Sequence, residues 1–103
     1  MRLHLEFHFS FDTGAISEEI ARKNTLYGAW NPDVTNVIST HGLVDPWRVM
    51  GIQEDINEQS PTLIIPGASH CNDLQAKNEK SDSRAMLQAR EQITGLVKKW
   101  VAL

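Results

Sequence analysis

The feature that most constrains the fold is an unbroken apolar run at residues 63–65, which two prolines frame in the segment PTLIIP. Continuous apolar runs of this length are typical of strands that are buried on both faces, as in a parallel sheet covered by helices. A second β-rich run, TNVIST, occupies residues 35–40. Residues 83–101 repeat apolar side chains at helical spacing, which predicts a long amphipathic helix capped by Asp82 or Ser83. This order of elements predicts an α/β architecture with a parallel sheet.

The first third of the chain carries weaker signals. Residues 3–12 alternate apolar and polar side chains, which predicts a strand with His4 and His8 on its solvent face. Residues 16–24 predict a short helix capped by Ser17. Two apolar strands and one long helix do not complete a core, so we expect the chain to form the edge of a larger domain.

Composition excludes several classes of function. The 103 residues carry a net charge of −3 with scattered Lys and Arg, which argues against nucleic-acid partners and against a polybasic membrane patch. No apolar stretch approaches the roughly 20 residues of a membrane span, and the first residues lack the apolar block of a secretory signal peptide. The single cysteine, Cys71, is a buried filler, a reactive thiol or half of a disulfide bond.

Two polar residues follow the predicted strands. Asp45 lies after the first run and His70 after the second, each a few positions beyond a glycine. Functional groups of open α/β sheets collect beyond the carboxyl ends of the strands, so both side chains should meet on one rim. A carboxylate there fixes the imidazole tautomer and leaves the other ring nitrogen as a general base.

Other readings of these residues stay open. Asp45 precedes Pro46, and this pair is a common helix start in which Asp caps and Pro takes the first position. His70 could equally be a loop histidine bonded to the backbone. A metal site built from His41, His70, Cys71 and Asp73 is a third reading, which no paired-ligand spacing supports.

A nucleophile is the missing part of such a site. In α/β-hydrolases the triad follows the chain order Ser, Asp, His, with the Ser in G-x-S-x-G. The sequence contains no G-x-S-x-G, and its nearest match, GASHC around Ser69, adjoins His70 itself. Ser69 is therefore excluded from that part, and nothing indicates that Cys71 is activated.

The segments YGAWNP, THGLVDPWRVMGI and SPTLIIPGASHCNDL together resemble the end of a family of serine exopeptidases. This family contains Pro-X carboxypeptidase, dipeptidyl peptidase II and thymus-specific serine protease. The resemblance covers roughly residues 16–101, and DPW followed by SHC at this spacing is its specific signal. A different α/β-hydrolase, such as an esterase, is disfavoured by the same pair of motifs.

The resemblance implies a role for each matching residue. Asp45 is similar to the catalytic aspartate and His70 to the catalytic histidine of the family. Trp47 is similar to a tryptophan that lines the pocket for the proline side of the scissile bond. Cys71 resembles a cysteine of some members and is a candidate for one half of a disulfide bond. The family implies no cofactor and no metal, peptide substrates, and a lysosomal or secreted enzyme; it leaves a homodimer open for full-length members.

The resemblance also implies a domain organisation. Residues 1–103 are expected to be the C-terminal segment of an α/β-hydrolase domain, with two or three parallel strands and the long C-terminal helix. Residues 1–30 form a poorly matched lead-in and residues 31–103 carry the Asp and the His. Departures from the family pattern are His41, where relatives often have Asn, and YGAW in place of YGG. Without its Ser the isolated chain is expected to be inactive; the alternative is a non-catalytic remnant that binds a partner through an exposed sheet edge.

Overall fold

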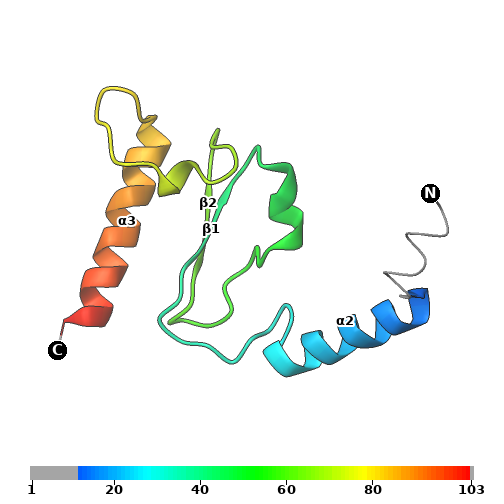
Figure 1. Ribbon diagram of the computed structural model, residues 1–103. Coiled ribbons are helices and arrows are strands. Elements are labelled where there is room, and N and C mark those ends of the chain that lie inside the picture. The colour runs from blue at the N-terminus through cyan, green and yellow to red at the C-terminus, as the bar shows by residue number, and fades with distance from the viewer. Residues whose placement is uncertain (1–11, 103) are drawn as a thin grey trace, which may run out of the picture. The chain divides into compact units, whose positions relative to one another are not determined.

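The computed structural model describes residues 12–102, and these fall into two compact units that divide after Pro32. The first unit holds the helix α2, Thr13–Tyr27. The second holds, in chain order, the strand β1, the 3₁₀ helix η1, the strand β2, the 3₁₀ helix η2 and the helix α3 (Figure 1). The strand predicted over residues 3–12 lies outside the described residues except for Asp12, which caps α2.

Helix α2 is longer than the sequence predicts, and Ser17 is not its cap. Asp12 takes that position, with its Oδ1 accepting a hydrogen bond from the backbone N–H of Ala15 at 2.7 Å. The Ser17 hydroxyl instead donates to the carbonyl of Thr13 within the helix. At the other end Gly28 adopts a left-handed conformation with φ of 86° and closes the helix onto Asn24, as a glycine readily does.

The sheet consists of β1, Ser39–Gly42, and β2, Thr62–Ile65, which run parallel with Gly42 opposite Ile65. The parallel pairing confirms the prediction for these two runs. Strand β1 begins later than predicted because Asn36 has a positive φ of 58° and donates its N–H to the carbonyl of Gln59. That turn geometry removes residues 35–38 from the strand.

The core of the second unit lies on one face of β2. Ile65, Ala68, Met86 and Ala89 form its buried cluster. Leu63 is only partly buried, and so is Ile64. The expected burial of both faces of β2 is therefore not met among residues 12–102, where only α3 packs against the strand in this cluster.

Helix α3, Arg84–Val101, confirms the long helix predicted for the end of the chain. Ser83 caps it by accepting a hydrogen bond from the N–H of Met86 at 3.1 Å. Met86 and Ala89 bury the first half of its apolar stripe, whereas Val97 in the second half remains 43% exposed. Neither helix in the described part of the chain combines the length and apolar character needed to cross a membrane.

Candidate active site

Asp45 stands in the turn that follows β1. Its N–H bonds back to the carbonyl of Gly42, and its side-chain Oδ1 accepts the N–H of Trp47 at 2.9 Å. That bond caps η1, Pro46–Met50, whose first position is occupied by proline. The capping role expected from the Asp-Pro sequence is thus present, and it uses one oxygen of the carboxylate.

His70 stands in the loop that follows β2. The side chain of Asn72 closes this loop, because its Oδ1 accepts both the N–H and the hydroxyl of Ser69, at 2.7 and 2.8 Å. Cys71 adopts a left-handed conformation with φ of 56°, and η2, Asn72–Leu74, follows. His70 therefore sits at the tip of a short turn that is tied at its base.

The structure brings the two residues together. His70 Nδ1 lies 2.8 Å from Asp45 Oδ2, the carboxylate oxygen that does not cap η1. An ionised carboxylate only accepts hydrogen bonds, so Nδ1 carries the proton and donates it, and Nε2 is the remaining ring nitrogen. Asp45 is 7% exposed, whereas the His70 side chain is 54% exposed, so the buried partner orients an accessible one.

The environment favours the ionised form of Asp45. The hydrogen bond from His70 holds the pKa of this carboxyl below its usual range. Burial works in the opposite direction, and the backbone N–H of Trp47 adds a smaller lowering of the pKa. A permanent carboxylate at this place would stabilise an imidazolium if one formed on His70.

Gly42 makes this meeting possible. A Cβ at this position would lie 2.5 Å from the carbonyl oxygen of Ser69 and closer still to that of Ala68. The end of β1 and the His70 loop thus touch backbone against backbone, and the N–H of Val44 donates to the carbonyl of Ala68 at 3.1 Å. Only glycine allows the two loops this approach.

An open pocket of about 380 Å³ lies over the pair and includes Trp47, Met50, Cys71 and Leu74 in its walls. The indole of Trp47 is 55% exposed and meets the imidazole of His70 edge-on, with ring centroids 4.7 Å apart. An exposed aromatic beside a carboxylate-bound imidazole offers a surface on which an apolar ring of a ligand can pack.

The other residues considered from the sequence have different surroundings. Cys71 is an exposed free thiol on the pocket wall, and the chain holds no second cysteine for a disulfide bond. His41 Nε2 lies 2.7 Å from the carbonyl of Ile52, and Asp73 Oδ2 accepts the hydroxyl of Thr40 at 2.7 Å. Among residues 12–102 no three His, Cys, Asp or Glu side chains gather as a metal site.

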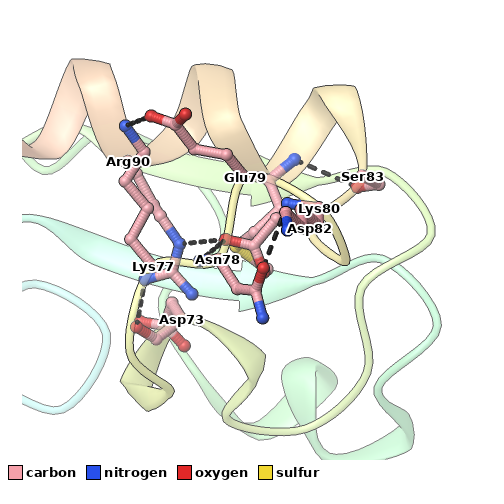
Figure 2. A network of polar contacts seen from close by, with 9 residues as sticks. Asp73, Lys77, Asn78, Glu79, Lys80, Asp82, Ser83 and Arg90 are labelled. Atoms are coloured by element: carbon pink, nitrogen blue, oxygen red, sulfur yellow. Dashed lines mark hydrogen bonds and ion pairs between the residues drawn. The ribbon is translucent and has the colours of Figure 1, made fainter.

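Sequence reasoning missed a polar network behind the His70 loop. Arg90 on α3 donates from Nε to Asp82 Oδ2 at 2.9 Å and from Nη1 to the carbonyl of Asp73 at 3.1 Å (Figure 2). A signal existed in the sequence, because Arg90 lies four residues after Met86 and three before Ile93, beside the apolar stripe of the helix. A cation at such a place is partly buried and needs a partner.

Comparison with known proteins shows the family to which the chain belongs. The family described as serine carboxypeptidase S28 matches residues 6–93. Thymus-specific serine protease of Mus musculus is 32% identical over 93 residues, which cover 90% of this chain and 18% of that protein. Lysosomal Pro-X carboxypeptidase of Bos taurus is 32% identical over 79 residues, which cover 76% of this chain and 16% of that protein.

The chain thus spans less than a fifth of the length of these curated relatives. No solved structure matches it. The family match extends over most of the sequence, including both loops that meet at Gly42. The chain belongs to the serine carboxypeptidase S28 family of serine peptidases.

Proposed function

We propose that this chain supplies the Asp and His of a Ser-Asp-His triad in a serine exopeptidase with an α/β-hydrolase fold. Residues 1–103 are the C-terminal segment of that domain, and residues 31–103 carry the pair. His70 takes the proton from the attacking serine and returns it to the leaving amine. Asp45 holds the His70 tautomer and stabilises the imidazolium.

One observation carries the proposal: the 2.8 Å bond between His70 Nδ1 and Asp45 Oδ2, made by a buried carboxylate to an accessible ring. A structural ion pair would not require the ring to face an open pocket, whereas a general base must reach its substrate. The parallel pairing of β1 and β2, each followed by one member of the pair, supports the α/β-hydrolase assignment.

The nucleophile comes from outside the 103 residues, because they contain no G-x-S-x-G. Ser69 does not substitute for it, since its hydroxyl is bonded to Asn72 and it adjoins His70. We therefore expect the purified chain alone to hydrolyse no peptide.

The substrates are peptides cleaved beside proline. Trp47 supports this preference, because its exposed indole lines the pocket next to His70 and a flat aromatic face packs well on a pyrrolidine ring. The relatives named above include a lysosomal Pro-X carboxypeptidase. We propose a lysosomal or secreted location on the same basis.

A graft into a relative tests the proposal. Residues 31–103 replace the matching segment of bovine lysosomal Pro-X carboxypeptidase, and hydrolysis of a Pro-containing chromogenic peptide is measured. The grafted enzyme should hydrolyse this peptide. Asp45→Asn in the grafted segment should lower kcat by about 10⁴-fold, because the imidazole then adopts the wrong tautomer. His70→Gln should abolish the activity.

Asp33→Asn provides the matched control, since Asp33 is exposed and lies away from the pocket lining. It should leave kcat within a factor of two or so of the unmodified graft. A graft in which Asp45→Asn behaves as Asp33→Asn does would exclude the triad role. A folded graft without activity would count equally against it.

A further inference from the structure

Asp73, just beyond the loop that carries His70, bonds to two other elements of the fold. The Asp73 side chain accepts the hydroxyl of Thr40 on β1 at 2.7 Å. Its backbone carbonyl accepts Nη1 of Arg90 on α3 at 3.1 Å. Asp73 is three positions after His70, directly beyond the turn that Asn72 closes. Displacement of Asp73 would therefore move the imidazole.

Arg90 is itself held in place. Its Nε donates to Asp82 Oδ2 at 2.9 Å, and the same oxygen accepts the N–H of Asn78 at 3.1 Å (Figure 2). The Arg90 and Asp82 side chains are only 14% and 15% exposed. A planar guanidinium fixed at one edge points its other nitrogens in set directions, which suits it to hold a carbonyl at a defined place.

Stability alone is a poor account of this arrangement. Within residues 12–102 Nη2 of Arg90 is a buried side-chain nitrogen without a hydrogen-bond partner. A partly buried ion pair with an unpaired donor gains little over an apolar side chain of the same size, because both charges lose their hydration. What an apolar side chain would not supply is the bond to the Asp73 carbonyl.

We propose that Arg90 is a positioning residue for His70: with Asp82 as its support it holds the Asp73 carbonyl and keeps the imidazole against Asp45. Within residues 12–102 the hydrogen bonds of Arg90 go to Asp82 and Asp73 and not to His70, and Arg90 is not part of the lining of the pocket that the pair faces. Thr40 is the second anchor of the same loop. That this positioning serves catalysis rests on the function proposed above.

The test reads the Asp45–His70 bond itself in the chain, by NMR. It measures the Asp45 carboxyl pKa by ¹³C titration and the His70 tautomer from the ¹⁵N shifts of its ring. Arg90→Met should raise the Asp45 pKa toward its usual range, because the hydrogen bond from His70 that lowers this pKa becomes weaker. It should also shift His70 from the pure Nδ1–H tautomer toward a mixture. Arg90→Lys should give values of both quantities between those of the wild type and Arg90→Met, because an ammonium group keeps the charge but lacks the planar guanidinium.

Arg22→Met is the matched control, because Arg22 makes an exposed ion pair with Glu19 on α2. It should change neither measurement. Thr40→Val removes the other anchor of Asp73 and should act as Arg90→Met does, with Thr40→Ser restoring the wild-type values. The Thr40 pair tests the same dependence of His70 on Asp73 from the other side, and Arg90→Lys keeps the test of Arg90 decisive if Arg90→Met does not fold.

Unchanged Asp45 pKa and His70 tautomer in folded Arg90→Met, whatever its stability, would reduce Arg90 to a structural residue and overturn the inference. If Arg90→Met does not fold, unchanged values in Arg90→Lys overturn it in the same way, because a lysine lacks the planar fork that holds the Asp73 carbonyl. The result is independent of the triad role, which the grafted enzyme tests by activity. An inactive graft beside shifted NMR values would reject the proposed function and leave the positioning of His70 by Arg90 established.

Discussion

The indole of Trp47 meets the imidazole of His70 at an interplanar angle of 62°, while the backbone N–H of the same tryptophan holds Asp45. One residue therefore contacts both members of the pair, by its ring and by its main chain. A substitution at position 47 removes the first contact and preserves the second.

Trp47→Leu should lower the free energy of unfolding by about 0.5–1.5 kcal/mol, the usual worth of an aromatic pair beyond its buried area. The cap on η1 should persist, because it uses a backbone donor. Urea unfolding measures the change, and Trp30→Leu is the control, since Trp30 is 62% exposed. Equal effects of the two substitutions would contradict a stabilising contact between Trp47 and His70.

Stability should depend on acid through Asp45. Its pKa in the folded chain lies below the value of about 3.9 typical of an unfolded chain, chiefly because His70 donates to it. This contribution is fully present above about pH 4 and is lost as the pH falls through the lower, folded-state pKa. Measured by urea unfolding between about pH 2 and pH 6, the free energy of unfolding should fall less steeply with acid in His70→Gln than in the wild type. Identical pH dependences in the two proteins would mean that the bond does not lower the Asp45 pKa in solution.

Gly42→Ala should destabilise the chain by about 1–3 kcal/mol, since its methyl group would collide with the backbone of the His70 loop. It should also separate His70 from Asp45, which the NMR measurement of the His70 tautomer detects. Gly95→Ala is the opposite case: apart from its own stretch of helix no described atom lies within 4 Å of the added Cβ, and Gly95 is interior to α3. That substitution should stabilise the chain by up to about 1 kcal/mol. A stable Gly42→Ala variant with an intact pair would disprove the close approach.

Ser83→Ala should cost about 1 kcal/mol of stability, because the N–H of Met86 loses its capping partner. Thermal unfolding followed by circular dichroism measures the loss. Ser81 lies two residues earlier, outside α3 and exposed, so Ser81→Ala should have little effect. If both alanines were equally tolerated, Ser83 would not be the cap that fixes the start of α3.

Local signals predicted the fold where the chain obeys local rules. The spacing from Met86 onward gave the long helix, and the run at 63–65 gave β2. They failed where a distant contact decides the backbone. Asn36 has a positive φ and donates its N–H to the carbonyl of Gln59, and no propensity at residues 35–38 reveals that partner.

The candidate pair was predictable because parallel strands deliver their following loops to one edge. To predict that Asp45 and His70 lie close together, that rule and the order of the two β-rich runs were enough. The anchoring of the loop was not predictable in the same way. Arg90 lies on α3, Asp73 in η2 and Asp82 in the loop between them, and only packing brings the three to one place.

The pairing of Gly42 with Ile65 puts both working loops at the carboxyl end of the two strands. The connection that returns to the start of β2 turns at the opposite end, where Asn57 and Ser60 bond to the carbonyl of Val34. Glu58 is exposed at that turn. A peptide tag inserted there would lie at the other end of the strands from the imidazole. This turn is therefore a suitable site for immobilising or labelling the protein without disturbing its pocket.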